Sequence, residues 1–481
     1  MSDNKKILSG LVWTMGEKLC SQIAHMVISI ILARLLAPEH YGVISITVVF
    51  INIAEVFITS GFGNALIQKK DADEEDYSSI FWLSLGFSVV LYLILFLASP
   101  FISAFYGNEK LTAILRVMSL SVLISALSTI QRSHVSKQMR FRKFFFSTTV
   151  GTFCSATAGI AMAYAGFGVW ALVAQNLMNS AVNAVVLWFT SGWKPKLIFN
   201  KSKARPLFSY SWKLMLSQFL SKLTENVRSL IIGKVFSASD LAYYDRGHSY
   251  PNIISTMINS SVSMVMFPAA SARQAELNEL KSLAKRAISI CDLIMAPLLF
   301  AFALCSKSLV CIFLTEAWLP CVPFLQIYCV FYLFVPINTI NLQIIKAKGR
   351  SDLVLKCEVV KKTFELLVIL FTVFVCKSVL AIAIGSLIAN LISNLINSMV
   401  NYKLISYGYF EQLWDVMKTI IPALIAVCGS FLLTSNIVNE YLKVIMQVCI
   451  VFIIYSVLLF VFDRKDLKYL ISVIKQYISK N

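Results

Sequence analysis

The chain has 481 residues, of which 58% are hydrophobic and 14% charged, and its formal net charge is +18 at pH 7. So apolar a composition is typical of an integral membrane protein and excludes a soluble enzyme built around a single core. The positive charge lies in short segments between apolar runs, which indicates cytoplasmic loops rather than a nucleic-acid surface, so no nucleic acid is expected as a partner.

The first apolar span, near residues 12–34, carries a polar stripe on one helical face. Its members are Thr14, Lys18, Ser21, Gln22, His25 and Ser29. Because a charge facing lipid is costly, the stripe predicts a helix that turns this face toward a hydrated interior. The span has no small-residue cleavage site after it, so we expect a retained first helix rather than a signal peptide.

Apolar runs long enough to cross a bilayer recur along the whole chain, and they number about fourteen. We expect them near residues 12–34, 42–61, 78–98, 111–130, 146–165, 168–188, 209–233, 249–270, 287–305, 321–342, 361–377, 379–401, 417–435 and 442–462. The expected fold class is therefore an all-α integral membrane protein. Lys and Arg gather in alternate connections, which predicts a multi-pass protein with both termini in the cytoplasm.

An internal repeat relates the two halves of the chain at an offset of about two hundred residues. Residues 33–41 align with residues 233–241, and a second polar stripe then falls into register with the first. Its members are Gln218, Ser221, Lys222, Glu225 and Ser229. We expect two pseudo-symmetric six-helix lobes, residues 1–189 and 207–402, joined by a cytoplasmic linker, 190–206. Residues 403–481 would add two spans and a cytoplasmic tail.

The cations of these helices are candidates for binding an anionic substrate in a cavity. Arginine and lysine form charge-assisted hydrogen bonds with phosphate and carboxylate oxygens. The candidates are Lys18, Lys222, Arg228, His25 and Arg116. His25 either titrates near neutral pH or is a hydrogen-bonded packing residue, and Arg116, in the fourth span, either has a polar partner or extends to the interface.

Three intramembrane carboxylates, Glu55, Glu225 and Glu17, are candidates for coupling transport to an ion or proton. Glu225 lies three residues from both Lys222 and Arg228, so its alternative role is only to neutralise one of them.

Neither catalysis nor a bound metal or cofactor is expected. The cysteines have no paired metal-ligand spacing, and Asp71 and Asp73 lie in an acidic loop rather than in a nucleotide-binding fold. The chain lacks an ATP-binding motif, so an ion gradient or downhill flow would drive transport.

Four segments resemble the Wzx-type flippases of the polysaccharide transporter family, in the multidrug/oligosaccharidyl-lipid/polysaccharide (MOP) exporter superfamily. They are residues 10–13 (GLVW), 31–42 (ILARLLAPEHYG), 61–68 (GFGNALIQ) and 243–246 (YYDR). The resemblance implies two MATE-like bundles that alternate between inward- and outward-facing states. It also implies a substrate, an undecaprenyl-diphosphate-linked oligosaccharide, and as partners membrane lipids, a polysaccharide polymerase and chain-length machinery.

Three alternatives remain open from the residues. A cation-coupled multidrug antiporter of the same superfamily would be expected to prefer a cavity of carboxylates. A murein-precursor flippase shares the expected architecture. A polysaccharide polymerase or ligase would need a large external loop with catalytic side chains, and the loops of this chain are short.

Overall fold

Helices make up the regular secondary structure in the part of the chain that the computed structural model describes. That part comprises residues 3–59, 72–138, 140 and 142–462, together with Gly63 and Leu66. The expected tail, 463–481, most of the 61–68 motif and Asp71 lie outside the described residues. Internal packing divides the chain into two units, Met1–Ala242 and Tyr243–Asn481.

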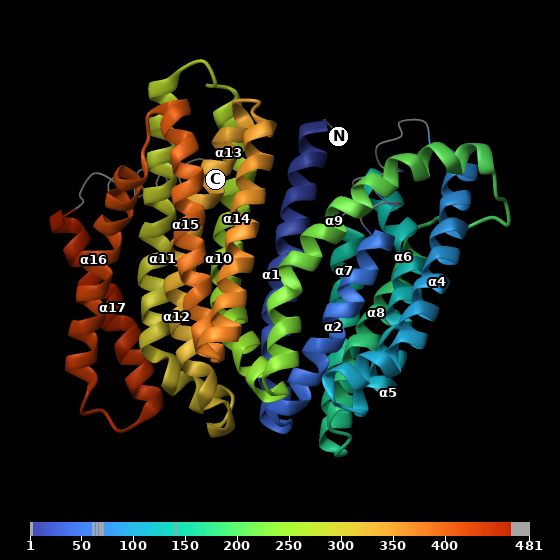
Figure 1. Ribbon diagram of the computed structural model, residues 1–481, viewed down its shortest axis with the longest axis horizontal. Helices are drawn as coiled ribbons and strands as arrows, with labels where there is room; N and C mark the ends of the chain where they lie inside the picture. The colour runs from blue at the N-terminus through green and yellow to red at the C-terminus, as the bar shows by residue number, and fades with distance from the viewer. Residues whose placement is uncertain are drawn as a thin grey trace. The chain divides into compact units, whose positions relative to one another are not determined.

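Unit 1 consists mainly of long helices that run alongside one another (Figure 1). They are α1 (Asp3–Leu35), α2 (Pro38–Thr59), α4 (Glu74–Tyr106), α5 (Lys110–Met118), α6 (Leu120–Lys137), α7 (Arg142–Tyr164), α8 (Val169–Thr190) and α9 (Lys201–Val235). The fourth predicted span is divided at Ser119 into α5 and α6. Gly107 ends α4 with φ 68°, a left-handed conformation that glycine adopts without strain.

Unit 2 takes in nearly all of α10 and every helix after it. The elements are α10 (Ala238–Ser271), α11 (Leu277–Phe313), the 3₁₀ turn η1 (Glu316–Cys321), α12 (Val322–Leu333), α13 (Val335–Ala347), α14 (Ser351–Phe371), the π turn η2 (Thr372–Cys376), α15 (Val379–Ile405), α16 (Tyr409–Thr434) and α17 (Glu440–Phe462). Helices α16 and α17 pack against each other and cover the last two expected spans, 417–435 and 442–462.

Twelve helical segments of the described chain are long and apolar enough to cross a membrane. The all-α membrane fold is thus confirmed, whereas the count of fourteen spans is not. Helices α9 and α14 are absent from the twelve. Both are long, at 35 and 21 residues, but charged side chains such as Lys222 and Arg228 in α9 and Lys361 and Glu365 in α14 lower their hydropathy.

Helix α9, expected at the start of the second lobe, packs against α2 and α4 in unit 1. Two glycines allow the close approach. A Cβ on Gly42 of α2 would lie 1.8 Å from the Ala238 carbonyl oxygen, and one on Gly233 of α9 would lie 2.9 Å from Cγ1 of Ile46. Packing divides the chain after Ala242, whereas the repeat predicts a boundary at the 190–206 linker. The two six-helix lobes therefore stay a prediction.

The helix ends agree with the repeat at the same offset. Helix α1 ends at Leu35 and α9 at Val235, while α2 begins at Pro38 and α10 at Ala238. The segments aligned from the sequence are therefore corresponding breaks between consecutive helices.

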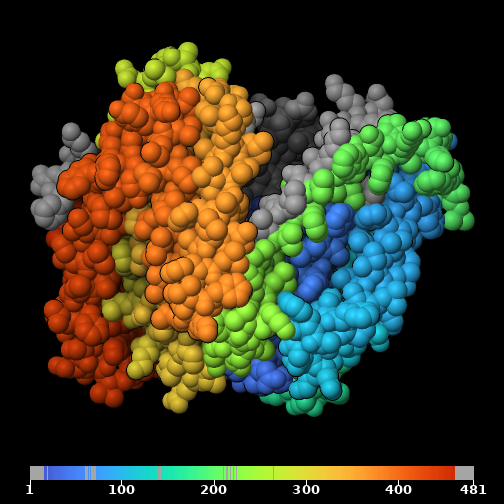
Figure 2. Space-filling view, in the orientation of Figure 1, coloured from blue at the N-terminus to red at the C-terminus, as the bar shows by residue number. Residues whose placement is uncertain are grey.

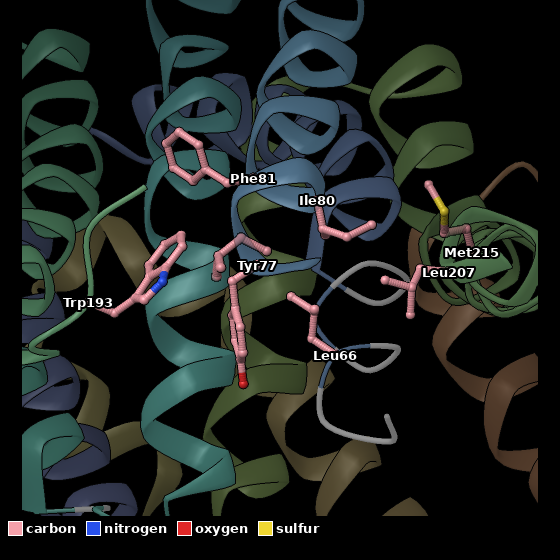
Figure 3. Close-up of a cluster of buried hydrophobic side chains, with 8 residues drawn as sticks. Leu66, Tyr77, Ile80, Phe81, Trp193, Leu207 and Met215 are labelled. Carbon is pink, nitrogen blue, oxygen red and sulfur yellow. The ribbon is translucent and has the colours of Figure 1, made fainter. Parts of the chain in front are cut away.

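A buried hydrophobic cluster fastens the 191–200 connection and the first half of α9 onto α4. Its residues are Leu66, Tyr77, Ile80, Phe81, Ile130, Trp193, Leu207 and Met215. Figure 3 shows Trp193 on one side of the α4 side chains and Leu207 and Met215 on the other. In the space-filling view the green segment of α9 lies against the light-blue end of α4 (Figure 2).

Polar contacts reinforce this attachment. The indole Nε1 of Trp82 donates to the Lys196 carbonyl at 2.9 Å, and the Asn200 amide donates to the Ser79 hydroxyl at 2.9 Å. Asp73 caps α4 through a capping box with Asp76 and also pairs with Lys203 of α9. The 191–200 connection thus attaches α9 to α4 within unit 1.

In unit 2, a row of buried asparagines on α15 supports the break between α12 and α13. The side-chain amide of Asn390 donates to the Phe331 carbonyl and that of Asn394 to the Phe334 carbonyl, both at 2.9 Å. Further along α15, the Asn401 amide donates to Oδ1 of Asn341 at 2.7 Å. In a membrane such backbone groups have no water to bond, so side-chain amides make the break tolerable.

Candidate functional site

Five helices of unit 1 bring polar side chains together, and we call this group the Arg132 cluster. Its members are Glu17 (α1), Glu55 (α2), Ser125 and Arg132 (α6), Ser147 and Thr148 (α7) and Asn183 (α8). Polar groups at membrane depth are found where they bond one another or face a hydrated space. The cluster is therefore the strongest candidate for a site in this unit.

Hydrogen bonds orient each carboxylate of the cluster. The hydroxyl of Thr148 donates to Oε1 of Glu17, and the hydroxyl of Ser125 donates to Oε1 of Glu55, each at 2.8 Å. These neutral donors hold the carboxylates in place without cancelling their charge. Glu17 and Glu55 are both half-buried.

Arg132 is held on the opposite side of the cluster by Asn183. Its Nη2 donates to Oδ1 of Asn183 at 2.9 Å, and the Ser147 hydroxyl donates to the Asn183 carbonyl at 3.0 Å. Glu17 and Glu55 lie close enough for their charges to act on the guanidinium. Neither forms an ion pair with it among the described residues.

The chemistry of the cluster follows from the unused donors of Arg132. The side chain is exposed to solvent, and Asn183 accepts from only one of the guanidinium N–H groups. The remaining donors form a planar fork that matches phosphate or carboxylate oxygens. The cluster can bind an oxyanion beside two carboxylates that are able to exchange protons.

Sequence reasoning misses Arg132, because the residue reads as part of a basic cytoplasmic connection. The structure places it within α6, five residues before the helix ends at Lys137. A signal is present, because Ser125, Thr129 and Arg132 recur at helical spacing on one face. The basic residues that follow Arg132 obscure this polar stripe.

The predicted site residues of α1 and α2 are only partly brought together. Glu17 and Glu55 join the Arg132 cluster, whereas Lys18 and His25 are exposed on α1. Within the described residues Lys18 makes no ion pair. It remains available to an anion that reaches this face of the helix.

On α9, Lys222 and Glu225 form a salt bridge of 2.6 Å, with side chains 43% and 51% exposed. This geometry matches the alternative in which Glu225 neutralises Lys222. An exposed pair of this kind is worth about 0–1 kcal/mol, so an anionic ligand can compete for Lys222 at little cost. Arg228 lies further along the same helix and is half-buried.

Arg116 has a polar partner and lies outside the Arg132 cluster. Its Nε donates to the Ser99 hydroxyl at 2.9 Å and to the Phe96 carbonyl at 3.3 Å, and its guanidinium lies 4.2 Å from the Phe96 ring centre. Pro100 lacks the N–H that would bond the Phe96 carbonyl in a regular helix. Arg116 therefore stabilises the proline-containing part of α4.

Comparison with known proteins identifies relatives over most of the chain. The profile of a family described as "Polysaccharide biosynthesis protein" matches residues 31–323. The teichuronic acid biosynthesis protein TuaB of Bacillus subtilis (strain 168) is 24% identical over 357 residues, 73% of each chain. The lipopolysaccharide biosynthesis protein WzxC of Escherichia coli (strain K12) is 22% identical over 367 residues, 75% of this chain and 74% of WzxC.

Among solved structures, the lipid II flippase MurJ in an inward closed conformation is similar to this chain. The TM-score is 0.76 at 15% sequence identity, over 94% of this chain and 99% of MurJ. At this identity the likeness shows a common fold, which agrees with the all-α membrane architecture.

Proposed function

This chain belongs to the polysaccharide biosynthesis protein family, and we propose that it moves undecaprenyl-diphosphate-linked oligosaccharide repeat units across the bacterial plasma membrane by alternating access. Its broader role is that of a flippase-type transporter of the MOP superfamily rather than of an enzyme. The translocated units would serve the synthesis of O-antigen, capsule or exopolysaccharide.

The Arg132 cluster is the observation that carries the proposal. A diphosphate or an acidic sugar offers the oxygens that the unused guanidinium donors of Arg132 would bind. Lys18, Lys222 and Arg228 would supply further positive charge along α1 and α9, and His25 a titratable donor. Glu17 and Glu55, which lie near Arg132, and Glu225 are the proposed coupling groups.

The direction of transport follows from the proposed orientation. With both termini in the cytoplasm, the basic connections face the inner leaflet, where lipid-linked units are assembled. A polymerase and chain-length machinery would then receive the units on the outer face. Arg132 supplies the donors that an anionic substrate needs, whereas Glu17 and Glu55 are carboxylates of the kind that a cation-coupled drug antiporter would use, so the test below has to separate the two.

The test compares Arg132→Ala with Arg140→Ala, a nearby arginine outside the cluster. The measurement is the leaflet distribution of undecaprenyl-diphosphate-linked oligosaccharide in cells that lack the native gene and express each variant. Loss of two or three hydrogen bonds to a charged group, about 1.5–3 kcal/mol each, predicts at least a tenfold slower export for R132A.

R140A should export at the normal rate, and R132K, which keeps the charge but loses the fork, should lie between the two. Normal export by R132A would remove the cluster from the proposed mechanism. An unchanged leaflet distribution in cells without the protein would overturn the proposed substrate and favour drug efflux instead.

A further inference from the structure

Among the described residues, a carboxyl group in the middle of a helix of unit 2 has no hydrogen-bond partner. Asp292 lies on α11, fifteen residues after Leu277, and its side chain is fully buried. Neither Oδ1 nor Oδ2 is bonded within the described part of the chain. Such a group contrasts with Asp415 on α16, which is also buried but is bonded by three side chains.

An ionised carboxylate in this position would have no water and no donor to compensate its charge. In an apolar medium such a group takes up a proton instead of remaining charged. The protonated acid costs much less free energy to bury, because it carries no charge. Burial without a donor therefore favours the protonated form of Asp292 in this conformation of unit 2.

Groups that can relay a proton lie near the start of α11, at one end of unit 2. There, Lys281 donates to the Ser406 carbonyl at 2.8 Å, and Lys285 lies 3.2 Å from Oδ1 of Asp415. The hydroxyl of Tyr407 donates to Oδ2 of Asp415 at 2.9 Å. If Asp292 were ionised, its charge would act on that hydroxyl.

The geometry of α11 agrees with this path. Lys285 and Asp292 are seven residues apart, which places them on one face of the helix about two turns from each other. The side chain of Lys285 is 42% exposed, so this end of the path is in contact with water.

The elements packed around α11 carry further charged groups. Within the described chain they are Glu316 in η1, Lys346 on α13, Lys403 on α15, Glu411 and Lys418 on α16, and Glu440 and Lys443 on α17. The tyrosines and cysteines of α11 and these elements are Cys291, Cys305 and Cys311 on α11, Cys321 in η1, Tyr328, Cys329 and Tyr332 on α12, Tyr402 on α15, Tyr409 and Cys428 on α16, and Tyr441, Cys449 and Tyr455 on α17.

A proline of α11 lies near the acid. Pro297 removes the N–H that would bond the Leu293 carbonyl, and the Tyr455 hydroxyl donates to that carbonyl at 3.2 Å. Prolines of this kind are points at which helices bend. Asp292 directly precedes Leu293, whose carbonyl accepts the hydrogen bond from Tyr455. A change of charge on Asp292 would therefore act beside that hydrogen bond.

From these observations we propose that Asp292 is a proton-binding site of unit 2 that is loaded and unloaded through Tyr407 and Asp415 during transport. Asp292 is protonated in the conformation described. In a conformation that admits water to α11, the acid would release its proton to that water. Linkage then makes proton binding and the conformational change of unit 2 favour each other. The role in transport rests on the proposed function, whereas the proton site itself does not.

The first test uses infrared difference spectroscopy on the full-length protein in vesicles of phosphatidylethanolamine and phosphatidylglycerol. At neutral pH the native chain should show the stretching band of a protonated carboxyl, and Asp292→Asn should lose it. Asp415→Asn is the matched control, because Asp415 is paired with lysines and should contribute no such band.

An unchanged band in D292N would overturn the proton site. If D292N fails to reach the membrane, Asp292→Glu replaces it, since a protonated Glu should keep the band at a shifted frequency. Tyr407→Phe should slow the isotope shift of the band in heavy water, and an unaltered rate would overturn the path through Tyr407.

The second test measures export of lipid-linked oligosaccharide as the external pH is varied. D292N should export at least tenfold more slowly and lose the pH dependence of the native chain, while D292E should retain part of both. If D292N exports at the rate of the native chain and keeps its pH dependence, the role of Asp292 in transport is overturned. If D292N loses the carboxyl band but the native chain exports no lipid-linked oligosaccharide, the proton site is supported and the proposed function is overturned.

Discussion

At the scale of single residues, two prolines of the membrane helices are compensated by the same device. Pro100 leaves the Phe96 carbonyl without its helical donor and Arg116 supplies one, while Pro297 leaves the Leu293 carbonyl to Tyr455. One side chain is charged and the other is neutral, but each donates from a neighbouring helix. A buried cation can thus be structural even where its depth suggests a ligand-binding role.

The compensation can be measured with a double-mutant cycle on Arg116 and Pro100. Arg116→Ala should lower the free energy of unfolding by about 1–2 kcal/mol, since Ser99 still donates to the Phe96 carbonyl. In a Pro100→Ala background the cost should shrink, because the restored N–H bonds the same carbonyl. Thermal unfolding in detergent is the measurement.

Arg34→Ala, at the exposed end of α1, serves as the control for that cycle and should be nearly neutral. Equal losses for R116A with and without Pro100 would show that Arg116 acts through the Phe96 ring alone.

Asp73 caps α4 and its pKa responds to the attached α9. The side chain of Lys203 and the backbone N–H of Asp76 lower the pKa of Asp73 to about 2. Because the pKa is depressed in the folded state, the stabilisation is complete above the ordinary pKa of aspartate and is lost as the pH falls toward 2.

The difference in melting temperature between the native chain and Asp73→Asn should therefore be constant near neutral pH and shrink below about pH 4. A difference that persists at the lowest pH would mean that the cap does not depend on the charge of Asp73.

At the scale of helices, the packing of α2 against the α9–α10 junction depends on the absence of a side chain at Gly42. The atom that a Cβ would meet there is a backbone oxygen, which cannot rotate away as a flexible side chain can. Gly42→Ala should destabilise unit 1 by about 1–3 kcal/mol through overpacking.

Gly86→Ala is the matched control, because a Cβ at Gly86 on α4 meets nothing within 4 Å. There the higher helix propensity of alanine should stabilise the protein by up to about 1 kcal/mol. Thermal unfolding of the two variants should thus move in opposite directions, and a neutral G42A would contradict the close approach of these helices.

At the scale of the whole molecule, each unit holds one helix that is long enough to span the membrane but rich in charge. Helix α9 carries Lys222, Glu225 and Arg228, and α14 carries the pairs Lys361–Glu358 and Lys362–Glu365. Charged helices of a transporter are expected to turn their charges toward other protein groups or a hydrated space rather than toward lipid. Both helices are therefore places where substitution should affect transport more than insertion.

The double variant Lys18→Ala with Lys222→Ala tests this expectation across α1 and α9. Export should be abolished while the amount of protein in the membrane stays normal, because neither side chain is buried and neither supports the core. Membrane fractions and the leaflet assay provide the two readouts. Normal export by the double variant would leave Arg132 as the main cation of the proposed site.

The sequence alone determined the membrane character, most of the spans, the repeat and the family resemblance. These properties depend on hydropathy and on spacing along one helix, which are local. The matching breaks after Leu35 and Val235 show how accurate local signals are. Glu17 and Glu55 are recognisable for the same reason, because a carboxylate within an apolar run is conspicuous.

The tertiary structure decided which of these groups meet. Helical periodicity indicates the face on which a side chain lies, but not the neighbouring helix that the face contacts. Only packing could bring Arg132 near Glu17 and Glu55 and assign Arg116 to the Phe96 carbonyl. Packing also decided that Asp292 is buried with no hydrogen-bond partner among the described residues. The sequence therefore determined that charges lie within apolar spans, and the fold determined which of them meet one another and which bond the backbone.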